Sequence, residues 1–194
     1  MALIVIVALG ESIVAIGVGA ESRVDGGVIA AAILGIAVAC ALWWTDFDVS
    51  ALAAARLLAE LESVEVRNRL ARDGYSYLHL PMVAAIVLVA LGGKTTLAHV
   101  GDPLSWPAAT ALVGGTALYL LAHVAFKVRT LGIFSVQRLG AAAVLLACLP
   151  LARRVDAGVT LAIVATVSWV LLAYEAVHYA ESRRAVRHAG QDHA

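Results

Sequence analysis

The chain has 194 residues, of which 62% are hydrophobic and 14% are charged, with a mean hydropathy of +0.89. Soluble domains average about 45–50% apolar and 25% charged residues, so this composition indicates a membrane protein. The net charge is zero, which gives no support for a nucleic-acid partner. Cys40 and Cys148 lie in apolar runs without metal-ligand spacing, so we expect buried thiols rather than a disulfide or a metal site.

Apolar stretches long enough to cross a membrane recur along the chain. A helix needs about 20 apolar residues to cross the hydrocarbon core, and six segments reach or approach that length. We therefore predict an all-α polytopic membrane protein, a bundle of about six transmembrane helices with one amphipathic surface helix. The bundle forms a single domain over 1–182, and a polar C-terminal tail follows over 183–194. The predicted spans are 2–20, 27–45, 75–93, 106–126, 133–152 and 157–180.

The first predicted span carries a glutamate, Glu11, near its middle. A charge at the bilayer centre costs about 2.5–3.5 kcal/mol, so we expect Glu11 to face other protein, a water-filled cavity or a proton. A protonated Glu11 that only hydrogen-bonds to a neighbouring helix or to Ser12 explains the sequence equally well. Met1 has no basic region behind it, so we do not expect a cleavable signal peptide, and the chain begins inside a helix as a fragment would.

The segment between the second and third spans has a different pattern. Over 49–72, leucine and valine residues recur at roughly helical spacing among arginines and glutamates. This pattern predicts an amphipathic helix on the membrane surface. An ordinary solvent-exposed helix would show the same alternation.

The fifth predicted span is the weakest, because Gln137 and Arg138 lie in its first turns and the apolar run before Pro150 is short. The distribution of basic residues supports its crossing, because six crossings place ten Lys and Arg residues on one side of the membrane and four on the other. The richer side is expected to be cytoplasmic, with both chain termini on it. Its ten residues are Arg56, Arg67, Arg69, Arg72, Lys127, Arg129, Arg138, Arg183, Arg184 and Arg187; the other side has Arg23, Lys94, Arg153 and Arg154.

This topology brings several ionisable residues of different spans to one depth. Carboxylates and imidazoles at a common depth can pass a proton or cation, whereas single His or Tyr residues near helix ends are often only interfacial. His79, His123, Glu175 and His178 fall at one depth, and Asp46 and Asp48 end the second span on the same side. On the fourth span Thr116, Tyr119, His123 and Lys127 share one helix face. The candidate polar or proton-handling residues are Glu11, Ser12, Asp48, His79, His123, Glu175 and His178.

Motifs of familiar enzyme and cofactor sites are missing from the sequence. It contains no GxSxG, no P-loop, no HExxH and no GxGxxG within a βαβ pattern. We therefore expect no catalytic residues, no cofactor and no metal, and do not expect an enzyme.

Four separate stretches, in order, resemble the bacterial low-temperature-requirement A family. They are GESIVAIG at 10–17, the Trp-Trp pair followed by Phe-Asp at 43–48, YSYLHLPMVAAIVLVALG at 75–92 and YLLAHVAFKVR at 119–129. The resemblance is to the second half of that family, whose members are multi-spanning membrane proteins of about twice this length. This sequence departs from the family pattern at Asp46, where an aromatic residue usually precedes the Phe-Asp pair. Glu11, Ser12, Asp48, His79 and His123 fall within the family's motifs.

The resemblance and the polar residues together lead to two expectations for function. The first is a transporter-like or channel-like bundle that handles a proton, a cation or a small polar solute. The second is a non-transporting membrane scaffold or stress-response factor whose 49–72 helix binds a partner. The lipid bilayer of the cell membrane is the expected surrounding, and a chain that supplies the family's first half, or a second copy of this chain, is the expected protein partner.

Overall fold

The computed structural model describes residues 10, 14, 25–47, 65 and 77–178, and this part of the chain is helical with no strand. It contains five helices long and apolar enough to cross a membrane. They are α2 (Gly26–Phe47), α5 (His79–Ala98), a continuous helix from Trp106 to Leu131, the span Val136–Arg153 and α9 (Ala157–His178). The span Val136–Arg153 consists of α8 (Val136–Cys148), a turn and the short 3-10 helix η3 (Leu151–Arg153). The predicted all-α polytopic membrane fold is confirmed. Of the predicted first span only Gly10 and Val14 are described, and of the 49–72 surface helix only Glu65; all three residues are helical.

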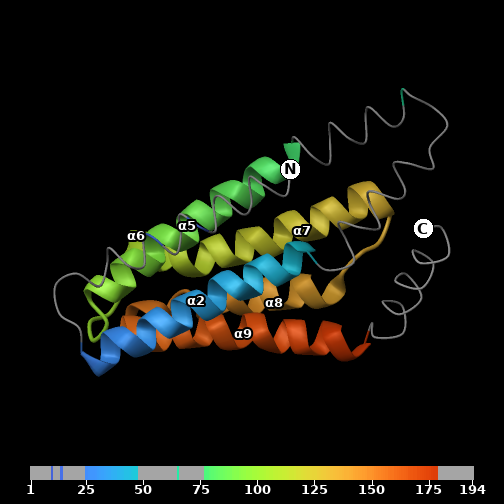
Figure 1. The fold of residues 1–194 in the computed structure, drawn as a ribbon. Helices are drawn as coiled ribbons and strands as arrows, with labels where there is room; N and C mark the ends of the chain where they lie inside the picture. The colour runs from blue at the N-terminus through green and yellow to red at the C-terminus, as the bar shows by residue number, and fades with distance from the viewer. Residues whose placement is uncertain (1–9, 11–13, 15–24, 48–64, 66–76, 179–194) are drawn as a thin grey trace.

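The five helices lie side by side in an elongated bundle whose chain direction alternates at each connection after α2 (Figure 1). The C-terminal ends of α2, α7 (Gly115–Leu131) and α9 and the N-terminal ends of α5 and α8 gather at one end, here called the His178 end. The opposite end, here called the Gly26 end, is closed by main-chain hydrogen bonds. There the N–H groups of Ala157 and Gly158 donate to the carbonyls of Asp102 and Val100, at 2.9 and 3.0 Å.

Two helices extend further than the sequence predicted. The third span, predicted over 75–93, begins as α5 at His79 and runs to Ala98, because Thr95 and Thr96 donate their hydroxyls to carbonyls one turn back and so do not compete with the helix. The fourth, predicted to end at 126, continues to Leu131 and ends at Gly132, whose φ of 66° is the left-handed conformation that glycine adopts without strain.

The fourth span changes its winding once. α6 (Trp106–Ala109) leads into a π-helical segment, η2 (Thr110–Gly114), which continues directly as α7. The span is also the most buried, with 72% of its apolar window inside the bundle against 22% for the α8 span. It therefore forms the centre of the bundle, with α8 on its outside.

Glycines bring α5 into close contact with this central helix. A methyl group on Gly92 would lie 2.6 Å from the backbone nitrogen of Leu112, and one on Gly115 would lie 3.0 Å from Leu88. In a bilayer, lipid tails compete equally well for apolar side chains, so close backbone approach supplies much of the association between helices. The two glycines therefore fix how α5 packs.

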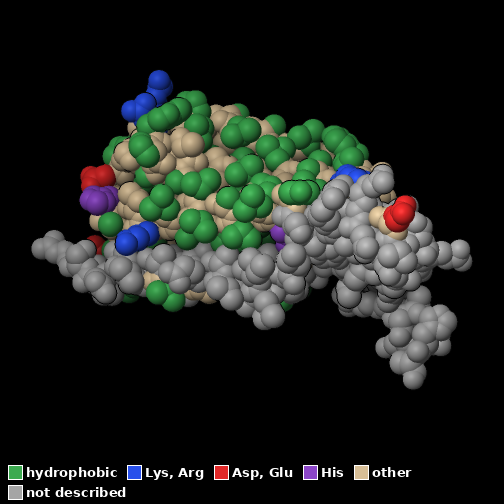
Figure 2. All heavy atoms as spheres, turned by 90° about the horizontal axis from the view of Figure 1, so that it is seen from above, with side chains coloured by type: hydrophobic (Ala, Val, Ile, Leu, Met, Phe, Trp, Pro, Cys, Tyr) green, Lys and Arg blue, Asp and Glu red, His purple; other side chains and the backbone are tan. Residues whose placement is uncertain are grey.

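The outside of the bundle is apolar over the middle of its length. Figure 2 shows hydrophobic side chains across one face, with charged side chains toward its ends. Large apolar residues are widely exposed on α2, α5, α8 and α9, with Ile33 at 62% and Val170 at 63%. Such a surface fits lipid rather than water.

The contact at Gly92 gives a matched test of the packing. Gly92→Ala is expected to destabilise the protein by about 1–3 kcal/mol, because the added methyl group collides with backbone atoms that cannot move independently. Gly93→Ala is the control, since its methyl group would meet nothing within 4 Å. Thermal unfolding in detergent should show a clearly lower midpoint for Gly92→Ala alone; equal midpoints would contradict this packing.

Candidate functional site

Most buried hydroxyl groups in the bundle need no functional explanation. Six Thr and Ser side chains each donate a hydrogen bond to the carbonyl four residues earlier in the chain, which satisfies the hydroxyl locally. These residues are Thr45, Thr96, Thr116, Thr130, Thr160 and Ser168. The polar side chains that join different helices are therefore the informative ones.

Five ionisable side chains from four helices meet toward the His178 end, and we call them the polar cluster. They are Asp46 on α2, Tyr119 and His123 on α7, Arg138 on α8 and Glu175 on α9. Tyr119 and His123 are 0% and 1% exposed, and Arg138 and Glu175 are 1% and 4% exposed. Groups of this kind inside a membrane span are rare and mark functional candidates by default.

Arg138 and Glu175 form a buried bidentate ion pair. Arg138 donates from Nε to Oε1 of Glu175 at 2.7 Å and from Nη2 to Oε2 at 2.9 Å. Two parallel bonds fix the guanidinium plane as well as its position. The third nitrogen, Nη1, is buried and has no hydrogen-bond partner among the described residues.

Tyr119 and His123 meet α2 in matching register. The Tyr119 hydroxyl donates to the Leu42 carbonyl at 2.8 Å, and Nε2 of His123 lies 3.3 Å from Oδ1 of Asp46. Both helices run toward the His178 end, and on each helix the two contacting residues are four apart. Two successive turns of α7 therefore face two successive turns of α2.

The ring of His123 is oriented by its own helix. Its Nδ1 lies 3.0 Å from the Tyr119 carbonyl, which can only accept, so Nδ1 carries the hydrogen. Nε2 then faces Asp46 as either an N–H donor or a bare lone pair. The contact fits an ion pair by distance but lacks good hydrogen-bond geometry, so it is a loose contact.

The Arg138–Glu175 pair and the group formed by Asp46, Tyr119 and His123 interact electrostatically. The charge of Arg138 reaches both Tyr119 and His123, and that of Lys127 reaches Glu175. At low local dielectric such interactions are screened far less than at a protein surface. A change of charge at His123 is therefore expected to act on both Asp46 and Glu175.

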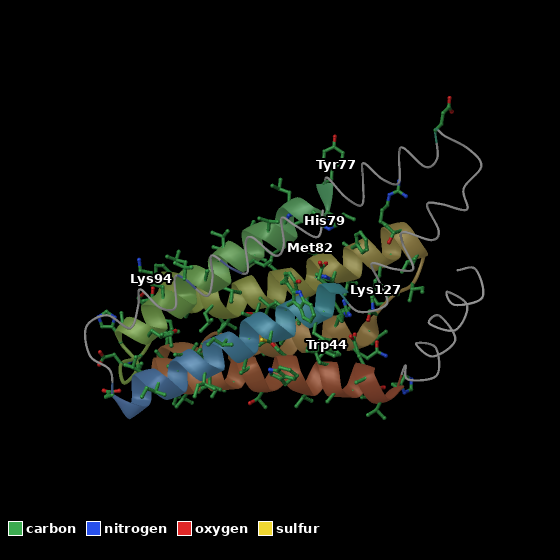
Figure 3. All side chains as sticks on the ribbon, viewed as in Figure 1. Trp44, Tyr77, His79, Met82, Lys94 and Lys127 are labelled. Carbon is green, nitrogen blue, oxygen red and sulfur yellow. The ribbon has the colours of Figure 1, made fainter. Side chains whose placement is uncertain are left out.

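The sequence candidates are distributed unevenly around this cluster. His123 and Glu175 belong to it. His79 lies at the start of α5 near Tyr77 and Met82 (Figure 3). Its ring and that of Phe126 pack edge to face, with their centroids 5.7 Å apart. His178 stacks on Tyr174, with the two ring centroids 5.3 Å apart, and both side chains are exposed. The remaining candidates, Glu11, Ser12 and Asp48, lie outside the described residues.

Three members of the cluster are not among the candidates predicted from the sequence: Arg138, Asp46 and Tyr119, the last of which was noted only on the polar face of the fourth span. Arg138 was counted with the basic loop residues, but it lies within α8 and is buried. Its place inside a predicted span was the available signal, because a charge there needs a partner. Asp46 was noted at the end of the second span, yet only the fold shows that it faces His123.

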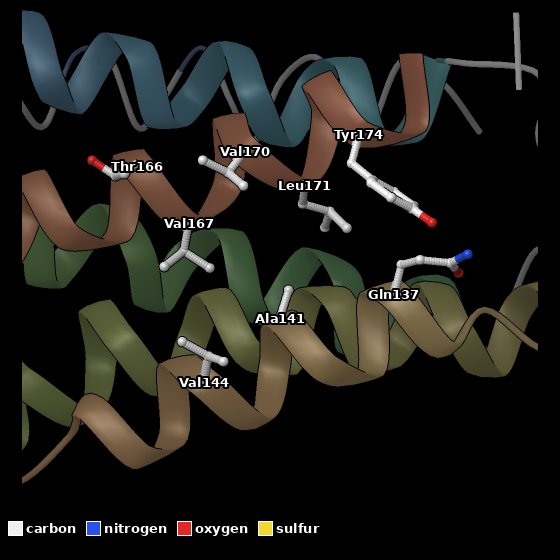
Figure 4. Close-up of a pocket in the computed structure, with 8 residues that line it drawn as sticks. All are labelled: Gln137, Ala141, Val144, Thr166, Val167, Val170, Leu171 and Tyr174. Carbon is white, nitrogen blue, oxygen red and sulfur yellow. The ribbon is translucent and has the colours of Figure 1, made fainter. Parts of the chain in front are cut away.

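A second concave feature lies apart from the cluster. A groove of about 410 Å³ runs between α8 and α9, with Gln137 and Tyr174 at one end, Thr166 toward the other and apolar side chains between them (Figure 4). Gln137 and Tyr174 each precede a member of the ion pair, so the groove uses a different face of these helices.

Among the described residues no three His, Cys, Asp or Glu side chains group as metal ligands.

The ion pair predicts strong coupling in stability. Arg138→Gln or Glu175→Gln alone is expected to cost about 3–5 kcal/mol, because each leaves an uncompensated buried charge. The double variant should be more stable than the sum of the two losses implies. Unfolding in detergent measures all three, with exposed Arg129→Gln as a control expected to change stability by less than about 1 kcal/mol. Additive losses would contradict the buried pair.

Comparison with known proteins agrees with the fold. No curated protein and no solved structure matches this chain. The family model described as bacterial low temperature requirement A protein (LtrA) matches residues 1–174, which confirms the resemblance of the sequence motifs. The match covers most of the chain, and five helices are apolar and long enough to span a membrane, so the chain belongs to the LtrA family of multi-pass membrane proteins.

Proposed function

We propose that this protein acts as a transporter-like or channel-like bundle that handles a proton, a cation or a small polar solute, with the polar cluster as the place where the transferred species is held. On this proposal it binds and releases its cargo without covalent chemistry and is not an enzyme.

The observation that carries the proposal is the pairing of His123 with Asp46. Because Nδ1 already donates to a carbonyl, the contact between Nε2 and Oδ1 is favourable only when a further proton lies between them. Without it, a nitrogen lone pair and a carboxylate face each other in a buried site. The pair therefore has two states that differ by one proton, as a proton-handling site requires.

The position of the cluster supports the same proposal. The side chain of Asp46 is 14% exposed and that of His123 is 2% exposed, so the pair connects a partly exposed group with a buried one. It lies toward the His178 end, and most of the central span lies between it and the Gly26 end. Glu11, in the predicted first span, is our candidate for continuing the path at the membrane midplane.

We further propose that the protein lies in the cell membrane with the His178 end and both termini on the cytoplasmic side. The basic residues of the sequence favour this orientation even when buried Arg138 is left out of the count. A chain supplying the family's first half, or a second copy of this chain, is the proposed partner in the membrane.

Flux measurements test the function. In liposomes holding an internal pH dye, wild-type protein should dissipate an imposed pH gradient, and Asp46→Asn or His123→Gln should lower the rate at least tenfold because the pair can no longer exchange its proton. Ser168→Ala is the control, since its hydroxyl bonds only within α9. Glu11→Gln tests the proposed midplane group in the same assay.

No flux of protons, cations or small polar solutes by folded protein would overturn this proposal. That outcome would favour the alternative, a membrane scaffold or stress-response factor that binds a partner through residues 49–72.

Labelling of single cysteines tests the orientation. Sites placed within 48–74, at 132–135 or after 180 should be protected from an impermeant reagent on intact cells, whereas sites near Arg23 or Gly101 should react. Cys40 and Cys148 are replaced by alanine beforehand. The reverse pattern would overturn the orientation and leave the function untouched.

A further inference from the structure

Tyr119 is a buried member of the polar cluster to which the proposed proton pair gives no role. Its side chain is 0% exposed, and its hydroxyl donates to the Leu42 carbonyl on α2 at 2.8 Å. A buried tyrosine hydroxyl needs a hydrogen-bond partner, and this one finds it on another helix. The buried threonine and serine hydroxyls bond to carbonyls one turn back instead. The hydroxyl of Tyr119 therefore links α7 to α2.

This bond ends on the carbonyl that closes the turn carrying Asp46. In an α-helix each carbonyl accepts from the N–H four residues later, so within α2 the Leu42 carbonyl is the backbone partner of Asp46. A carbonyl oxygen has two lone pairs and can accept the tyrosine hydroxyl as well. The hydroxyl therefore holds the turn of α2 on which Asp46 lies.

The same tyrosine also holds the other side of the pair. Its main-chain carbonyl lies 3.0 Å from Nδ1 of His123, and the centroids of the two rings are 4.4 Å apart. These contacts fix the imidazole with its Nε2 directed at Oδ1 of Asp46, 3.3 Å away. Tyr119 thus contacts His123 directly and Asp46 through the turn that carries it.

Within the described helices, little else sets the distance between Asp46 and His123. α2 packs mainly along α9, and its contact with α7 is limited. Apolar contact in lipid does not fix the rotation of a helix. The contact of 3.3 Å is already long, and a further separation of about 0.5 Å takes it beyond hydrogen-bond range. Proton exchange therefore depends on what holds α2 against α7.

We infer that Tyr119 is a positioning residue of the proton site, and that its hydroxyl keeps Asp46 within reach of His123. This inference rests on the proposed function and adds to it the residue that sets the geometry of the pair. Tyr119 does not carry the proton itself, because its one hydroxyl hydrogen is already donated to a carbonyl, which can only accept.

Tyr119→Phe tests the inference, because it removes the hydroxyl and keeps both the ring and the main-chain carbonyl beside His123. The variant should fold, since the Leu42 carbonyl retains its bond within α2. In the liposome assay its proton flux should fall at least fivefold, because a small misplacement of reacting groups slows transfer strongly. An unchanged rate would overturn the inference.

Thr116→Val is the matched control. It removes another fully buried hydroxyl from the same helix, three residues before Tyr119, and keeps the shape of the side chain. That hydroxyl donates to the Leu112 carbonyl and does not reach α2. Its flux should stay within twofold of the wild type. Equal losses in the two variants would mean that any missing buried hydroxyl slows transport, which contradicts a positioning role for Tyr119.

The ¹⁵N NMR signals of the His123 ring separate positioning from other effects on the rate. They are compared in detergent at a pH where the ring is protonated in each protein, and His123→Gln assigns them. In Tyr119→Phe the Nε2 signal should move because Asp46 withdraws, whereas the Nδ1 signal should stay because its partner is a main-chain carbonyl. Thr116→Val should move neither. A slower Tyr119→Phe with an unchanged Nε2 signal would also overturn the inference.

Failure of this inference can be told apart from failure of the proposed function. If the folded wild-type protein shows no flux, the proposed function fails. The Nε2 signal of Tyr119→Phe then still reports whether the hydroxyl holds Asp46 against His123.

Discussion

A charged group inside a membrane span has to find its partner within the protein, and the pairing of Arg138 with Glu175 meets that constraint here. α8 has 13 residues and is therefore about 20 Å long, less than the hydrocarbon thickness. It is also the least buried part of the described bundle, so apolar packing holds it weakly. The ion pair fixes its first turn to α9 and so determines where the helix enters the bundle.

α2 is held by directional bonds of another kind. The Tyr119 hydroxyl donates to its Leu42 carbonyl, and the indole nitrogen of Trp169 donates to its Ala37 carbonyl at 3.0 Å. Lipid tails are as apolar as the side chains, so apolar contact alone does not favour one orientation of a helix against its neighbours. Hydrogen bonds of this kind therefore fix the rotation and register of α2 more than they add to the strength of its packing. The rotation they set turns Asp46 toward His123, which makes the proton site a consequence of how α2 is anchored.

The fold was largely predictable because hydropathy reports the element type directly in a membrane. The helix ends were less so: Lys127 and Arg129 look like loop residues in sequence, yet α7 runs past them to Gly132. Residue types alone placed His123 and Glu175 at one depth. They did not show which residues face each other, because pairing across α8 and α9, or across α2 and α7, depends on helix rotation and on contacts between residues as far as 77 positions apart.

The π-helical segment at Thr110–Gly114 has a consequence for how this family can vary. A π turn holds about one residue more than an α turn, and each residue turns an α-helix by about 100°. The segment therefore sets the phase between the first turn of the span, α6, and α7, which packs on α5 at Gly115 and carries His123. Losing one residue there would restore a plain α-helix and rotate α6 against α7. Relatives with a one-residue deletion at this position should place a different helix face, and hence different residue types, opposite the end of α2.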